Sequence, residues 1–115
     1  MSALHKTSWN ASEPDIMEIS GRLDADTALI VEEDALLCIR SGAREMLLDC
    51  SGLESVTGAG MQTLLRLARE MRAARGKLAV CNLRPQVKEM FDVCGIENMI
   101  AIYEDRATAR AALAA

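Results

Sequence analysis

The hydrophobic pattern of this chain changes its period several times, and this alternation restricts the fold more than any other feature of the sequence. Residues 46–48 and 78–80 are apolar at consecutive positions, which is typical of short strands covered on both faces. Between them, residues 61–71 are apolar at steps of three and four, which predicts a helix that ends at Gly76. Strands separated by such helices need crossover connections, so the pattern predicts a mostly parallel sheet covered by helices.

The first part of the chain fits the same scheme. Residues 4–9 alternate weakly and predict an edge strand, which a polar connection over residues 10–14 follows. Residues 16–19 predict a second strand, which ends at Gly21. Asp24 and its neighbours then precede a helix, because the next apolar residues share one helical stripe. The stripe consists of Ala28, Val31, Ala35 and Cys38.

The last part of the chain adds two helices and a strand. Pro85 begins a helix that ends before Gly95, because proline favours the first helical position and glycine the end. Residues 99–103 predict a final strand, and Asp105 caps an alanine-rich terminal helix. We therefore expect an α/β fold with a mostly parallel sheet of four or five strands and about four helices.

The length of 115 residues is that of one domain, so we expect a single domain over residues 1–115, with residues 1–13 as an N-terminal edge strand and connection. With 50% hydrophobic and 26% charged residues, the chain is too apolar to remain disordered. An aromatic content of 3% and a net charge of -4 argue against nucleic acid as a partner. We find neither a signal peptide nor an apolar run long enough to cross a membrane, and expect a cytoplasmic protein that is not membrane-inserted.

The cysteines and the histidine limit the chemistry that is available. Cys38, Cys50, Cys81 and Cys94 form no CxxC pair, so we interpret them as reduced, mostly buried structural thiols. A redox pair of Cys50 and Cys81, each at the end of a predicted strand, is the alternative. His5 is the only histidine, which removes most histidine-based catalytic or zinc sites.

Three carboxylates beside predicted element ends raise the question of a metal or acid–base site. Asp49 follows a strand, and Asp24 and Asp26 stand near a helix start. Helix capping and interaction with the helix dipole explain all three without further chemistry, so we expect no metal, no cofactor and no catalytic residue. Residues 32–34 are interpreted as a solvated helix face. In a parallel sheet, functional surfaces gather beyond the carboxyl ends of the strands, which directs attention to residues 49–60.

Four motifs in this order resemble the STAS family, which is named for sulphate transporters and anti-sigma factor antagonists. They are GRLD at residues 21–24, LLDCSGLESV at 47–56, TGAGM at 57–61 and GKLAVCNLRPQVKEMFDVCGI at 76–96. The resemblance covers about residues 14–105. It implies a non-catalytic module that binds an anti-sigma factor, which is also a serine kinase. In such proteins, phosphorylation of a serine at the start of the module's second helix breaks the complex.

The resemblance also indicates where this chain departs from the family. The typical loop is Asp-Ser-Ser-Gly-Leu, and alignment on Gly60 and Met61 places Thr57 at the aspartate, Gly58 at the first serine and Ala59 at the phosphorylated serine. The acceptor hydroxyl is therefore absent at residue 59. By this resemblance we expect the partner-binding surface to comprise Asp24, Ser55, Thr57, Gly58, Ala59, Gly60 and Met61.

Several interpretations stay open at this point. Thr57 is either the N-cap of the second helix or a displaced phosphorylation site. Met61 is either core filler or part of the partner-facing edge, and a homodimer is compatible with the sequence. Two other functions are alternatives: a STAS subunit of a membrane-associated transport complex, and a small redox or anion-binding protein that uses Cys50 and Cys81.

Overall fold

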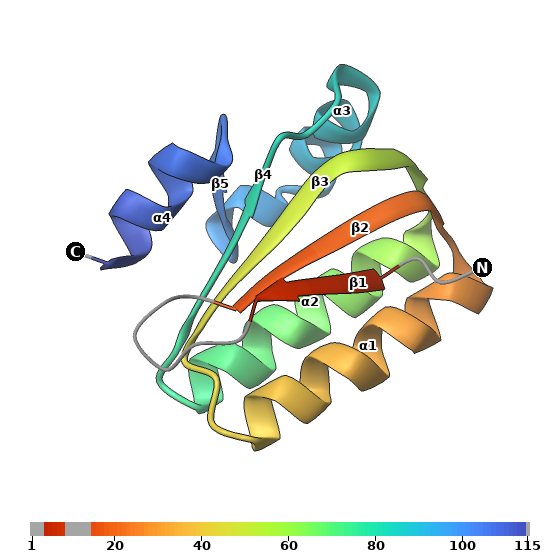
Figure 1. Ribbon diagram of the computed structural model, residues 1–115. Coiled ribbons are helices and arrows are strands. Elements are labelled where there is room, and N and C mark those ends of the chain that lie inside the picture. Colours follow the sequence, from red (N-terminus) through yellow and green to blue (C-terminus); the bar gives the residue numbers. More distant parts are fainter. Residues whose placement is uncertain (1–3, 9–14, 115) are drawn as a thin grey trace.

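A computed structural model describes residues 4–8 and 15–114, in which five strands form one sheet (Figure 1). The strands are β1 (Leu4–Ser8), β2 (Asp15–Leu23), β3 (Glu45–Val56), β4 (Lys77–Cys81) and β5 (Ala101–Tyr103). They follow their sequence order across the sheet; β1 runs antiparallel to β2, and the other neighbours are parallel. The predicted α/β class and the mostly parallel sheet are confirmed. The predicted connection over residues 10–14 lies outside the described residues.

Helices cover both faces of this sheet. They are α1 (Ala25–Arg40), α2 (Gly58–Ala73), α3 (Pro85–Cys94) and α4 (Arg106–Ala114), with a short 3-10 helix, η1 (Ile96–Asn98), that the sequence pattern did not predict. Figure 1 shows α1 and α2 side by side against one face, with α4 on the other side of the sheet. No helix in the described part of the chain is long and apolar enough to span a membrane.

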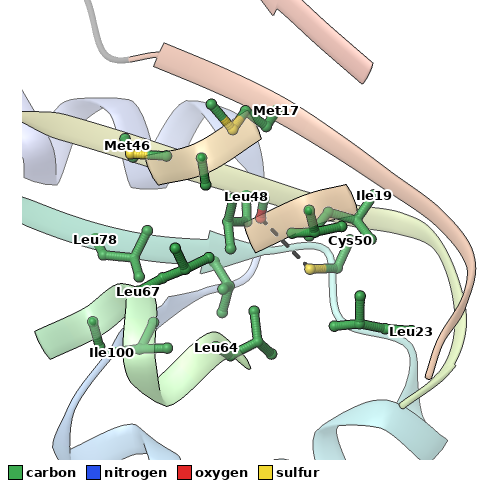
Figure 2. Close-up of a cluster of buried hydrophobic side chains, with 14 of the residues drawn as sticks. Met17, Ile19, Leu23, Met46, Leu48, Cys50, Leu64, Leu67, Leu78 and Ile100 are labelled. Carbon is green, nitrogen blue, oxygen red and sulfur yellow. Dashed lines mark hydrogen bonds between the residues drawn. The ribbon is translucent and has the colours of Figure 1, made fainter. Parts of the chain in front are cut away.

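The main core lies between the sheet and the layer of α1, α2 and α3. Alternate residues of β2 and β3 point into it and meet the apolar face of α2, as Figure 2 shows. Each fully buried aliphatic side chain of this kind contributes roughly 1.5–3 kcal/mol. The central residues include Met17, Ile19, Leu23, Met46, Leu48, Cys50, Leu64 and Leu67.

The opposite face of the sheet has a smaller core beneath α4. It consists of Ile16, Leu47, Ala79, Cys81, Ala109 and Leu113. The alternation along β4 explains why that strand is apolar throughout: Leu78 and Val80 belong to the large core, and Ala79 and Cys81 to the small one. The expectation of a strand covered on both faces is confirmed.

Strands β2 and β3 are longer than the sequence pattern predicts. Gly21 does not end β2; it lies within the strand at φ +76°, where the pairing with β3 shifts register. Strand β3 continues past Asp49 to Val56, so the loop predicted over residues 49–60 is reduced to Thr57. Helix α2 accordingly begins at Gly58 rather than at Met61.

Candidate functional site

The starts of α1 and α2 lie next to each other because β2 and β3 are neighbours and end in register, with Leu23 opposite Val56. One residue separates each strand from its helix: Asp24 before α1 and Thr57 before α2. The carbonyl oxygen of Leu23 accepts a hydrogen bond from the Thr57 amide at 2.9 Å and another from its hydroxyl at 3.4 Å. The two connections therefore form one joined surface.

Asp24 caps α1 with its carboxylate. This group accepts hydrogen bonds from the amides of Asp26 at 3.0 Å and Thr27 at 3.1 Å, while the Thr27 hydroxyl accepts from the Asp24 amide in return. The hydrogen bond from the Thr27 amide is the main reason that the pKa of Asp24 lies below its ordinary value. Asp24 thus acts as a helix cap, as the sequence predicted.

Thr57 caps α2 with a neutral hydroxyl. Its oxygen accepts from the Gly60 amide at 3.4 Å, and the first turn of α2 contains no acidic residue. Gly60 allows the helix start to sit tightly here, because an added Cβ would meet the Leu23 carbonyl oxygen and lie 2.8 Å from Val56 Cγ2. The N-cap interpretation of Thr57 is confirmed.

The expected binding residues differ in their accessibility. Gly58 is exposed, and Asp24, Ser55, Thr57 and Ala59 are half-buried. Gly60 is buried, and Met61 is 3% exposed and packs in the main core. The interpretation of Met61 as a partner-facing residue is therefore wrong for its side chain, which serves the core instead. The accessible surface at the start of α2 is formed by residues 57–59.

A shallow groove of about 340 Å³ begins at Ala59 and runs between α1 and α2. Its walls are lined by Ala25, Ala28, Leu29, Glu32, Ala59, Gln62, Thr63 and Arg66. Thr63 is 8% exposed, and its hydroxyl makes no hydrogen bond within the described part of the chain. Sequence reasoning missed this groove, although Leu29 stands apart from the buried stripe of its helix and is a visible signal of an exposed apolar position.

Asp49 lies elsewhere, on the α4 side of the sheet, where its carboxylate caps no helix. Its carboxylate accepts from Arg106 Nη2 at 2.6 Å and Nε at 3.1 Å, from Asn82 Nδ2 at 3.1 Å and from the Ser51 amide at 3.0 Å. Burial opposes ionisation of Asp49, but these hydrogen bonds, led by Arg106, outweigh it and hold its pKa below the usual value. The capping interpretation of Asp49 is wrong; it anchors the start of α4.

The structure separates the two cysteines that the redox alternative would pair. Cys50 packs in the main core and Cys81 in the core beneath α4, so their thiols lie on opposite faces of the sheet. Burial raises the pKa of Cys81 to about 12 and that of Cys50 further still. Cys38 is half-buried and Cys94 exposed, so two of the four thiols are less buried than expected. Within residues 15–114 no cluster of metal-ligating side chains occurs.

Comparison with known proteins decides the family. The model of the STAS domain matches residues 11–109. This chain belongs to the STAS family. A relative named as an anti-sigma factor antagonist, BtrV of Bordetella bronchiseptica, is 28% identical over 94 residues, which are 82% of this chain and 81% of that protein.

Solved structures of other proteins have the same fold. A crystal structure of an anti-sigma factor antagonist from Mycobacterium paratuberculosis superposes with a TM-score of 0.83, at 17% identity over 98% of both chains. The phosphorylated form of SpoIIAA from Bacillus superposes with a TM-score of 0.71, at 18% identity over 92% of this chain and 96% of that one. At these identities the likeness establishes the fold, and the α/β architecture predicted for this STAS domain agrees with it.

Proposed function

We propose that this STAS domain is a non-catalytic regulatory module, in the cytoplasm, that binds an anti-sigma factor of the serine-kinase kind. The observation that carries the proposal is the exposed start of α2, where Thr57, Gly58 and Ala59 present a neutral surface with no acid in the first turn. The relative BtrV, named as an anti-sigma factor antagonist, matches this chain over four fifths of its length and supports the same role. Asp24 and Ser55 extend the binding surface.

We further propose that binding is not switched off by phosphorylation at residue 59. Ala59 has no hydroxyl, and its methyl group lines the groove between the helices. Thr57, the neighbouring hydroxyl, is engaged with the Gly60 amide and the Leu23 carbonyl, so a phosphoryl group there would cost the helix its cap. These two features support a protein whose partner binding is not switched off by phosphorylation.

The test uses a purified serine-kinase-like anti-sigma protein, taken first from the genes that neighbour this one, and isothermal titration calorimetry. Ala59→Asp should remain folded and weaken binding by about 2–4 kcal/mol, because an unpaired charge would be desolvated at the interface. Ala59→Ser should bind like the parent. Val93→Asp is the matched control, since it adds the same charge at an exposed position of α3.

Phosphorylation is measured in the same system by intact-mass spectrometry after incubation with ATP. The parent chain should stay unmodified, and Ala59→Ser should gain one phosphoryl group. Binding of Ala59→Asp with the parent's affinity would show that the start of α2 is not the interface. A phosphoryl group on Thr57 or Ser55 of the parent would restore a displaced switch and contradict the second proposal.

A further inference from the structure

The two neighbouring helices α1 and α2 carry opposite charge. Helix α1 and its cap hold five acidic residues against one basic residue, Arg40. Helix α2 and the turn after it hold four arginines against one acidic residue, Glu70. The acids are Asp24, Asp26, Glu32, Glu33 and Asp34, and the arginines are Arg66, Arg69, Arg72 and Arg75.

Few of these charged residues form ion pairs between α1 and α2 of the same chain. Within residues 15–114, the ion pair between Arg66 Nη1 and Glu32, at 3.4 Å, is the only one that joins the two helices. Glu33 and Arg69 are exposed and form no ion pair in the described part of the chain. Most of these charged side chains are exposed, and Figure 1 shows the two helices that carry them side by side.

Three of the exposed apolar side chains lie on α1. Leu29 is 59% exposed, Ile30 40% and Leu37 64%, and all three belong to α1. The fourth large exposed apolar residue in the described part of the chain, Val93, lies on α3. An apolar stripe with acidic flanks on one helix, beside an arginine-rich helix, is typical of a surface that another protein covers.

We propose that the outer face of α1 and α2 binds a second copy of this chain. A two-fold axis that runs along the helices would place α1 of each copy on α2 of the other, so acidic residues meet arginines twice. An axis across the helices would instead place α1 on α1 and bring the acids together. Charge thus selects the first arrangement.

The observed ion pair also fixes the level at which the two copies meet. Because Glu32 and Arg66 lie side by side in one chain, an axis along the helices brings Glu33 to the level of Arg66 and Arg69 of the other copy. The methylene stems of these arginines would cover Leu29 and Leu37 while their guanidinium groups reach the acids. Helix α1, with 16 residues, offers a contact about 24 Å long.

Sedimentation velocity of the full chain over a range of concentrations tests the proposal without any other protein. We expect a reversible dimer whose dissociation constant rises at least about tenfold between ~0.05 M and ~1 M salt. Glu33→Arg and Arg69→Glu should each weaken the dimer about tenfold or more, and the double variant should restore it. The control Asp92→Arg makes the same charge change on α3, outside this face, and should leave the dimer unchanged.

The apolar part of the contact is tested separately. Leu37→Ser should weaken the dimer, whereas Val93→Ser, which removes a still more exposed side chain on α3, should not. A chain that stays monomeric at every concentration and salt would overturn the proposal. A dimer in which Glu33→Arg behaves like Asp92→Arg would also overturn it, because the contact would then use another face. Neither result depends on the anti-sigma partner or on Ala59.

Discussion

The starts of α1 and α2 are neighbours with the same geometry but different chemistry. Both helices begin one residue after a parallel strand, and both caps have extended backbone angles. The α1 start is filled by the chain's own carboxylate, since Asp24 accepts from two amides and Asp26 follows in the first turn. The α2 start is capped by a hydroxyl that accepts from one amide, and it has no acid.

This difference leaves more of the helix dipole without a compensating charge at the start of α2 than at the start of α1. The carboxylate cap satisfies two amides of the first turn of α1, and its charge offsets the dipole of that helix. At α2 the Thr57 hydroxyl satisfies one amide, and no carboxylate offsets the dipole. The comparison predicts that the stability of the fold depends more on the cap of α1 than on the cap of α2, and this can be tested at each position.

The largest effect is expected at the glycine that lets the two starts approach. Gly60→Ala should destabilise the fold by about 3 kcal/mol, because its Cβ would meet the Leu23 carbonyl and the side chain of Val56. Gly58→Ala is the matched control: apart from its chain neighbours and the backbone of its own helix turn, nothing lies within 4 Å of the added Cβ, so it should be neutral or stabilising by about 0.5 kcal/mol. Urea denaturation measures both. Equal effects would mean that the two starts are not held together at Gly60.

The next effect concerns the carboxylate cap. Asp24→Ala should lower the thermal midpoint by roughly 4 °C or more, because two amides lose their acceptor. Since the hydrogen bond from Thr27 lowers the pKa of Asp24 in the folded state, the ionised cap stabilises the protein above the unfolded value of about 3.9. That stabilisation is lost as the pH falls through the lower, folded value.

Asp24→Asn isolates this pH dependence, because asparagine keeps a capping oxygen and cannot ionise. The difference in thermal midpoint between the parent and Asp24→Asn should shrink as the pH is lowered below about 4. A difference that stays constant from neutral pH to acid would show that the charge of Asp24 does not contribute to the cap.

The smallest effect is expected on the α2 side. Ala59→Asp should raise the stability of the free protein by about 0.5 kcal/mol. The first turn of α2 lacks an acid, and a carboxylate there would interact favourably with the helix dipole. The same substitution at Ala73, in the last turn, should be destabilising. Calorimetric melting of the two variants at low salt checks the sign. If both substitutions shift the midpoint in the same direction, an added negative charge is not favoured at the start of α2.

Local patterns predicted the helices well but misjudged the end of β3. The caps Asp24, Thr57 and Asp105 are visible in the sequence because capping acts over three residues. In β3 the buried positions after Asp49 are spaced by three, at Cys50, Leu53 and Val56, rather than by two. The cause is the pair of register shifts against β2, which add residues to β3 and conceal its alternation.

Contacts between residues far apart in the sequence could not be predicted from local patterns. Asp49 and Arg106 are 57 residues apart, and only the packing of α4 across β3 and β4 joins them. The groove at Ala59 likewise depends on how closely α1 and α2 approach. The family resemblance directed attention to residues 57–61 through their motif. Of the two interpretations of Met61 that the sequence left open, core filler is confirmed.

The hydrogen bonds from Thr57 to Leu23 have a consequence for the thermodynamics of association. With one residue between β3 and α2, tied to the neighbouring strand through both its amide and its hydroxyl, the surface around Ala59 has little freedom to lose on complex formation. Such preorganisation lowers the entropic cost of binding, so changes of affinity at residue 59 should arise from side-chain chemistry rather than from refolding of a loop. A partner would therefore bind a surface whose backbone conformation is already fixed.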